Sequence, residues 1–156
     1  MPFTMNVKHK YTVPTEDMRI GALLRVPANA VRHRIIQGLN AAGFTDLRVP
    51  HLAVLQYPGP DGMRPGSLAE LAGMSKQAMN QLLKSLEALG YISRFDAPDE
   101  GRARVVRLTK RGRAAYFKTY DILSEIEREW SAELGQKSFN QLKLLLLRVW
   151  ESPLVR

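Results

Sequence analysis

Apolar and polar positions follow a helical period most clearly over residues 75–89. On one side of this stretch apolar residues recur at intervals of three and four: Met79, Leu82, Leu83, Leu86 and Leu89. The neighbouring side carries long polar residues: Lys76, Gln77, Asn80, Gln81 and Lys84. Such side chains can reach base edges and phosphates while the apolar face anchors the helix to a core. The pattern predicts a helix that reads DNA, here called the reading helix.

The residues before the reading helix predict a shorter helix and a turn. Ser67 and Glu70 have the spacing of a capping box, so a helix is expected to begin at Ser67. Gly73 can adopt a positive φ and end that helix, and Ser75 suits the N-cap of the next. A helix, a glycine turn and a second helix make up the helix-turn-helix unit. Because the same pattern also occurs in all-α proteins that do not bind DNA, other features must decide.

A β-hairpin is expected after the reading helix, with strands over residues 91–95 and 102–108 and the turn APDEG between them. Alternation along the second strand puts Arg102 and Arg104 on the same side, close to the tip. Arginines in that position suit the minor groove or the phosphates beside it. Alternatively, they belong to a solvated hairpin end and pair with Asp96, Asp99 or Glu100.

Positive charge is concentrated on this part of the chain. The 156 residues include 23 Lys and Arg against 15 Asp and Glu, which gives a net charge of +8. Residues 75–113 hold nine of these cations and four of the anions, so a quarter of the chain carries +5. This distribution is typical of a DNA-binding face. The predicted DNA contacts are Ser75, Lys76, Gln77, Asn80, Gln81, Lys84, Arg94, Arg102 and Arg104.

Composition removes several classes of site. The chain has no cysteine, which excludes disulfides, thiolate nucleophiles and cysteine-ligated zinc. The histidines His9, His33 and His51 lack the spacing of a metal set, so neither a metal nor a cofactor is expected. No apolar run approaches the roughly 20 residues that span a bilayer, and residues 1–14 lack the apolar stretch of a signal peptide. We expect a cytoplasmic protein that does not enter a membrane.

Helices are also expected on the N-terminal side. Residues 1–14 are interpreted as a terminal arm, for which an unstructured or packed terminus is favoured over a DNA contact. Thr15 suits the start of a first helix that keeps its apolar spacing as far as Gly43. Pro27 interrupts this helix and predicts a kink or a break. Pro50 suits the first turn of a second helix, which residues 58–62 end in a turn.

Two helices are expected after the hairpin, the first beginning at Thr109 and ending at Gly135, the second beginning at Ser138. Residues 144–147 of the second are apolar on nearly every side, so this helix must be buried. A second copy of the chain would bury it, and packing against the N-terminal helix is the alternative. The predicted dimer interface comprises Ile20, Leu23, Leu24, Leu142, Leu145, Leu146, Val149 and Trp150.

With these features the chain resembles the MarR family of bacterial transcription regulators, which are winged helix-turn-helix proteins. The resemblance covers roughly residues 17–156 and is most specific over residues 68–112. Within the wing, Asp99, Gly101-Arg102, Leu108-Thr109 and Gly112 match the family pattern in order. The tip APDEG departs from it, because the family more usually has Asp-Arg-Asp-Gly-Arg. Pro27 also departs, since the first helix of the family is usually unbroken.

The resemblance implies a mostly α fold with a small β-hairpin wing, in a homodimer whose terminal helices intertwine. It further implies reading-helix contacts in the major groove of double-stranded DNA and Arg102 in the minor groove, over a pseudo-palindromic site. The implied divisions are an arm over 1–14, a dimerisation helix over 15–44, a winged helix-turn-helix domain over 45–112 and dimerisation helices over 113–156.

Many members of this family are repressors that small aromatic acids release from DNA, after binding between the dimer helices and the DNA-binding lobe. Residues on the corresponding segments that could bind such an acid are His33, Arg48, His51, Tyr116 and Tyr120. Each of these side chain types more often has a structural role than a ligand contact.

The sequence therefore favours a sequence-specific, dimeric transcription repressor, with a small-molecule effector as a further possibility. A non-specific or architectural DNA-binding protein is the alternative. Gln77, Asn80 and Gln81 argue against it, because amide side chains read bases and a purely ionic surface would carry Lys or Arg there. No nucleophile elbow, phosphate-binding glycine loop or set of paired carboxylates supports an enzyme.

Overall fold

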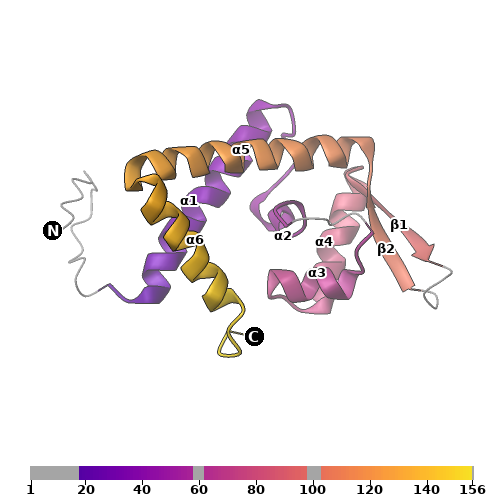
Figure 1. Ribbon diagram of the computed structural model, residues 1–156. Helices are drawn as coiled ribbons and strands as arrows, with labels where there is room; N and C mark the ends of the chain where they lie inside the picture. Colours follow the sequence, from indigo (N-terminus) through magenta and orange to yellow (C-terminus); the bar gives the residue numbers. More distant parts are fainter. Residues whose placement is uncertain (1–17, 58–61, 98–102, 156) are drawn as a thin grey trace.

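The computed structural model describes residues 18–57, 62–97 and 103–155 (Figure 1). Its elements in chain order are α1 (Ile20–Ala41), a 3-10 turn (Val49–His51), α2 (Leu52–Leu55), α3 (Pro65–Ala72), α4 (Lys76–Ala88), β1 (Ile92–Ala97), β2 (Ala103–Leu108), α5 (Lys110–Leu134) and α6 (Gln136–Trp150). The predicted mostly α fold with a β-hairpin is confirmed. Three predictions lie outside the described residues: the terminal arm over residues 1–14, the helix start at Thr15 and the place of Arg102.

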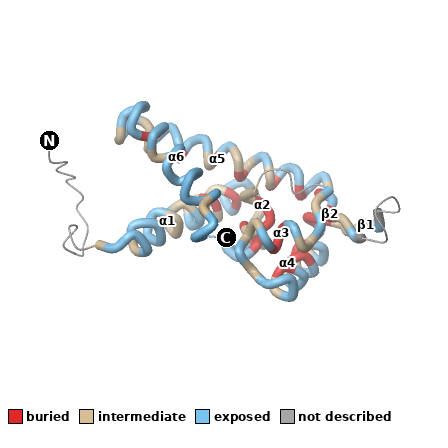
Figure 2. The backbone as a smooth tube through the Cα atoms, turned by 60° about the horizontal axis from the view of Figure 1, so that its bottom comes forward, coloured by how far each residue is buried: buried red, intermediate tan, exposed pale blue. Residues whose placement is uncertain are grey.

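The elements form two groups (Figure 1). The long helix α5 runs along one edge of the molecule, α1 packs against it, and α6 folds back from its far end. We call α1, α5 and α6 the helical arm. At the other end of α5 lie α2, α3, α4 and the antiparallel hairpin, which we call the winged lobe. Buried positions concentrate in the winged lobe and where α1 and α5 meet it, whereas α6 and the first half of α1 are mostly exposed (Figure 2).

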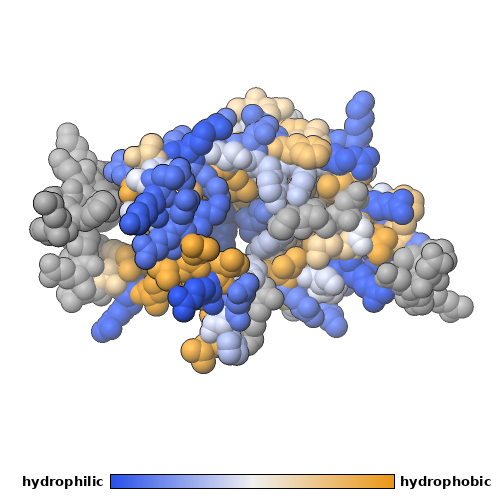
Figure 3. All heavy atoms as spheres, viewed as in Figure 1, coloured by the Kyte–Doolittle hydropathy of each residue, from blue (hydrophilic) through white to orange (hydrophobic). Residues whose placement is uncertain are grey.

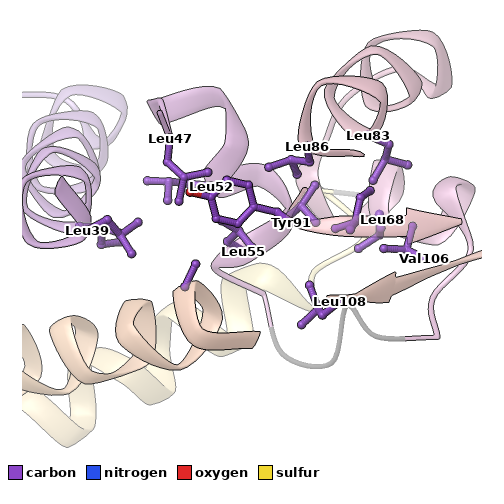
Figure 4. Packing of buried hydrophobic residues seen from close by; sticks show 14 of the residues in the cluster. Leu39, Leu47, Leu52, Leu55, Leu68, Leu83, Leu86, Tyr91, Val106 and Leu108 are labelled. Carbon is purple, nitrogen blue, oxygen red and sulfur yellow. The ribbon is translucent and has the colours of Figure 1, made fainter. Parts of the chain in front are cut away.

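One hydrophobic core joins the two groups (Figure 4). Leu39 of α1 and Leu47 after it approach Leu52 and Leu55 of the lobe, and the Tyr91 ring lies at the centre. Beyond that ring the core continues through Leu86 and Leu83 of α4 to residues of α3 and the hairpin, among them Leu68, Val106 and Leu108. Because these side chains are almost fully buried, the lobe and the adjoining part of the arm are stabilised together.

The expected helix-turn-helix unit is present. Gly73 takes the left-handed conformation at φ 63° after α3, where glycine carries no steric penalty. Ser75 is the N-cap of α4, and its hydroxyl oxygen accepts a hydrogen bond from the Ala78 amide at 3.1 Å. Thr109 caps α5 in the same way, accepting from the Gly112 amide at 3.0 Å. The local signals in the sequence correctly marked these three positions.

Two predicted helix starts were wrong. The helix α3 begins at Pro65 rather than Ser67, since proline fits the first helical position, where its missing N–H costs no hydrogen bond. Ser67 consequently lies inside the first turn. The helix α6 begins at Gln136, directly after Gly135, so Ser138 is also inside its helix. The chain reverses between α5 and α6 at a single residue, Gly135, whose φ is 82°. A longer linker between the two helices is therefore unnecessary.

Pro27 does not break the first helix, because α1 continues from Ile20–Ala41 through it. Of the two predicted alternatives, the break is therefore wrong, and the kink stays a prediction. Proline removes one backbone donor from the helix, a local cost. Beyond Pro27 the apolar face of α1 packs into the core with Ile35 and Leu39, and this burial keeps the chain helical on the C-terminal side of the proline.

The hairpin is widened by the short extended piece before α3. The Gly62 amide donates to the Val106 carbonyl at 2.6 Å, and the Val106 amide donates to the Met63 carbonyl at 2.9 Å. Within the hairpin, Arg94 pairs with Val106 and Phe95 with Val105. Because neighbouring residues of a strand point to opposite faces, Val106 enters the core on the same face as Arg94, and Phe95 lies on the outer face.

The start of α5 is pressed against the start of the hairpin. A Cβ atom added to Gly112 would lie 1.9 Å from the Tyr91 carbonyl oxygen, so only glycine fits there. Next to it, the Thr109 amide and hydroxyl both donate to that carbonyl, at 3.0 and 3.1 Å, and the hydroxyl also donates to the Gly90 carbonyl at 2.7 Å. The Thr109 and Gly112 positions thus join α5 to the end of α4.

No helix in the described part of the chain is long and apolar enough to cross a membrane.

Candidate nucleic-acid interface

The helix α4 has one buried and one exposed face, as the reading helix was expected to have. Met79, Leu83 and Leu86 are fully buried, while Leu82 is half-buried. The predicted polar contacts on α4 and its cap are all exposed: Ser75, Lys76, Gln77, Asn80, Gln81 and Lys84. These residues offer hydroxyl, amide and ammonium groups to a partner without disturbing the core. The polar face predicted for this helix is therefore exposed, and its contact with DNA stays a prediction.

A buried histidine holds α4 against the 3-10 turn. The Nδ1 atom of His51 accepts a hydrogen bond from the Arg48 amide at 3.0 Å, so the proton of the neutral ring is on Nε2. From there it is donated to the Ser85 hydroxyl on α4 at 3.1 Å. Burial lowers the pKa of His51, which keeps the ring neutral. His51 was predicted to contact an effector, whereas the structure gives it this structural contact.

The three predicted arginines of the hairpin differ in their surroundings. Arg94 donates from Nε and Nη2 to one carboxylate oxygen of Glu87, at 3.1 and 2.7 Å, and its side chain is only 13% exposed. This hydrogen bonding lowers the pKa of Glu87. Arg94 therefore ties the hairpin to α4 instead of facing solvent. Arg104 is exposed and lies 3.5 Å from the Asp96 carboxylate, in agreement with the alternative of a solvated, ion-paired hairpin end. Arg102 belongs to the residues that are not described.

A pocket of about 210 Å³ lies between the helical arm and the winged lobe. Its polar lining comes from Arg32 on α1 and from Gln56 and Tyr57 after α2. The remaining lining is apolar and comes from the 3-10 turn, α2, the end of α3, the turn after it and α4: Val49, Pro50, Leu52, Ala53, Ala72, Met74 and Leu82. A lining with one cationic group and mainly apolar side chains suits a small organic acid.

None of the five residues predicted to contact an effector lines this pocket. His33 bonds to the Asn29 carbonyl of its own helix at 2.8 Å, and Arg48 donates to the Thr45 and Leu47 carbonyls. Tyr116 and Tyr120 pack together on α5 with their ring centroids 4.8 Å apart, and burial raises the pKa of Tyr120 to about 12. Sequence reasoning selected His33 on α1, but Arg32, one position earlier, faces the pocket. A difference of one residue turns a helical side chain by about 100°.

The helical arm leaves a large apolar surface uncovered. Hydrophobic residues gather over α6 and the beginning of α1 in Figure 3. On α1 the exposed residues are Ile20, Leu23, Leu24 and Val26, and on α6 they are Leu144, Leu145, Leu146, Leu147, Val149 and Trp150, each between 42% and 69% exposed. Within one chain the packing of α1 and α6 does not bury them. A patch of this kind marks a surface for association.

An exposed polar face on the second helix of a helix-turn-helix unit, followed by a hairpin, defines a winged helix-turn-helix protein of the DNA-binding class. Comparison with known proteins identifies the family. A model described as "MarR family" matches residues 42–103. The HTH-type transcriptional repressor Rv2887 of Mycobacterium tuberculosis is 30% identical over 128 residues, covering 82% of this chain and 86% of the relative. The chain belongs to the MarR family of transcription regulators.

Solved structures have the same fold. The crystal structure of the Mycobacterium tuberculosis MarR family protein Rv2887 in complex with salicylic acid matches with a TM-score of 0.61 and 26% identity, over 86% of this chain and 98% of that one. The transcriptional repressor CouR bound to a 23-mer DNA duplex matches with a TM-score of 0.70 and 17% identity, over 92% and 100% of the two chains. The second likeness is informative for the fold alone.

The buried His51 predicts a dependence of stability on pH. Because its pKa is lowered in the folded state, the unfolded chain takes up the proton more readily. Above about pH 6.5, the pKa of histidine in the unfolded chain, the neutral ring makes its full contribution to stability. This contribution is lost as the pH falls through the lower pKa that His51 has in the folded protein. Urea unfolding of the wild type between about pH 8 and pH 5 should show this loss.

The variant His51→Gln has an acceptor and a donor that do not titrate, so its free energy of unfolding should fall less over the same range. His33→Gln is the matched control, because His33 is exposed on α1, and it should behave as the wild type does. An equal fall in all three proteins would show that His51 is not the cause.

Proposed function

We propose that this protein is a homodimeric, sequence-specific repressor that binds a pseudo-palindromic operator in double-stranded DNA. The observation that carries the proposal is the exposed face of α4, where Gln77, Asn80 and Gln81 stand beside Lys76 and Lys84. Amide side chains can donate and accept at the same base edge, which is how adenine is read in the major groove. The lysines on either side suit phosphates, which position the helix without reading the sequence.

The hairpin, or wing, is the second part of the protein that we propose contacts DNA. Arg104 is exposed near the end of the hairpin, and Arg102 lies two residues closer to its tip in the sequence. Asp96 is close enough to Arg104 to orient its guanidinium group without covering it, since both side chains are more than half exposed. We assign these two arginines to the minor groove or its flanking phosphates. Arg94 is left out of this surface because Glu87 already engages it.

A second copy of the chain is the proposed cover for the apolar surface of α1 and α6. The buried side of α6 is limited to Phe139, with Leu142 half-buried, while all four leucines of α6 after Leu142 are exposed. Two copies related by a twofold axis would bury both patches against each other and present two α4 helices to the same face of DNA. This arrangement requires an operator with two related half-sites.

An effector is the finer part of the proposal. The pocket beside Arg32 touches the helical arm, the helix-turn-helix turn and α4 at Leu82, so an occupant would contact the elements that position the reading helix. Its volume of about 210 Å³ suits a single aromatic ring with a carboxylate. A structurally similar relative was crystallised with salicylic acid. We therefore assign a small aromatic acid to this pocket.

Selection of bound duplexes from a random DNA pool at near-physiological salt tests the proposal directly. We expect enrichment of a pseudo-palindrome with half-sites about one helical turn apart.

Replacing Asn80 by alanine should then relax the base preference at one position per half-site, by roughly 1 to 3 kcal/mol. The control Lys84→Ala should weaken binding to all sequences alike and lower the salt slope by about 1. If the selected duplexes share only a base composition and no common sequence, the protein is a non-specific or architectural DNA-binding protein instead.

Leu145→Asp should convert the dimer to a monomer, because it places a charge within the apolar surface of α6. Sedimentation equilibrium measures the mass, and operator binding should be lost together with the dimer. Leu145→Met is the control, since a residue of similar volume and polarity should retain both. A mutant that is folded, soluble and still dimeric would show that the interface lies elsewhere.

Salicylate should weaken operator binding by the wild type in a titration followed by fluorescence anisotropy. With Arg32→Ala, about ten times more salicylate should be needed, because a hydrogen bond to a charged group contributes roughly 1.5 to 3 kcal/mol. Arg25→Ala removes the same charge from α1 at an exposed position outside the pocket lining and should respond as the wild type does. If Arg32→Ala keeps the wild-type response, the pocket is not the effector site.

A further inference from the structure

Arg111 connects four segments of the chain. It stands in the first turn of α5, and its Nη1 group donates to the Leu89 carbonyl at the C-terminal end of α4 at 2.6 Å. Its Nη2 group donates to the Asp46 carboxylate, in the segment between α1 and the 3-10 turn, at 2.9 Å. The guanidinium plane also lies over the Tyr91 ring at the start of the hairpin, 4.3 Å from the centroid.

The contacts of Arg111 form a closed network. The Tyr91 hydroxyl donates to the other oxygen of the Asp46 carboxylate at 2.5 Å, while the Tyr91 ring is fully buried in the core. Hydrogen bonding to Tyr91 and to Arg111 lowers the pKa of Asp46, so the carboxylate stays charged. The guanidinium group of Arg111 therefore binds Asp46 and Leu89 with its donors and packs one of its faces on the Tyr91 ring.

This network joins the end of α4 to the start of α5. Leu89 is the C-cap residue directly after α4, and its carbonyl is one of the acceptors without an intrahelical partner at the negative end of the helix dipole. Arg111 is fixed to α5, which belongs to the helical arm and continues to the apolar surface at the far end. A guanidinium bound to both elements resists rotation of α4 relative to α5.

We propose that Arg111 is a positioning residue that sets the angle between α4 and α5, and through it the spacing of half-sites that the dimer accepts. This inference rests on the proposed function, because spacing has a meaning only for a dimer with two reading helices. Arg111 does not act as a DNA contact in this proposal, since its donors are directed to Leu89 and Asp46. Specificity for spacing is thus separated from specificity for bases, which belongs to Asn80 and its neighbours.

The test compares the selected operator with versions that have one base pair inserted or deleted between the half-sites. Such a change turns one half-site by about 35° around the duplex and moves it by about 3.4 Å. For the wild type we expect roughly tenfold weaker binding to the altered duplexes, and for Arg111→Ala a penalty of about threefold or less. Binding constants are measured by fluorescence anisotropy on all three duplexes.

Lys110→Ala is the matched control, because it removes the same charge from the neighbouring position in the first turn of α5. It should keep the wild-type penalty for altered spacing. Should Arg111→Ala be unfolded by circular dichroism, Arg111→Lys decides, since an ammonium group cannot form the fork to Asp46 and Leu89 while stacking on Tyr91. It too should tolerate the altered duplexes.

Two results would overturn the inference. If the folded Arg111 variants keep the full tenfold penalty, Arg111 has no part in spacing. If they keep that penalty and also bind all three duplexes more weakly by the same factor, as a mere loss of charge would cause, the role is electrostatic. A wild type that is indifferent to spacing would overturn the dimeric operator of the proposed function itself, and this result is recognisable without any variant.

Discussion

The contact between the Tyr91 backbone and the first turn of α5 is the constraint on which the other parts depend. There is no space for a side chain at Gly112, and the Thr109 hydroxyl and amide occupy the remaining directions around the Tyr91 carbonyl. The hairpin cannot move away from α5 without breaking these hydrogen bonds. Because the Tyr91 ring is also the centre of the core, the same residue joins the packing of the lobe to the backbone of the arm.

The exposed face of α4 is held in register by contacts on its other sides. His51 bonds to Ser85, and Arg94 bonds to Glu87, both in the last turn of the helix. The buried leucines fix the depth of the helix in the lobe. A base contact depends on positions within about half an ångström, so a rigid support of this kind is what a reading surface requires. Most of the residues involved never touch the surface that they orient.

The correct sequence predictions depended on local patterns of neighbouring residues. The errors arose where two such patterns competed, or where a side chain bonds to a residue far away in the sequence. The period of α4, the Ser75 and Thr109 caps and the apolar run of α6 depend on neighbouring residues, and the structure has them all. Ser67 has the spacing of a helix cap, but the proline two residues earlier also suits a first helical position, and α3 begins at that proline. The alternation of the hairpin did not reveal that Arg94 pairs with Glu87. The Asp46–Arg111 contact joins residues 65 positions apart, beyond any local rule.

The helix α5 has 25 residues, which corresponds to a rod about 37 Å long at 1.5 Å per residue. Its first turn is fastened to the hairpin, and its last turn leads into α6 through Gly135. Such a rod works as a lever, because a tilt of about 5° at one end displaces the other by roughly 3 Å over that length. This displacement is close to the rise of one base pair, about 3.4 Å. A small change of angle where the arm is anchored would therefore move a reading helix from one base step to the next.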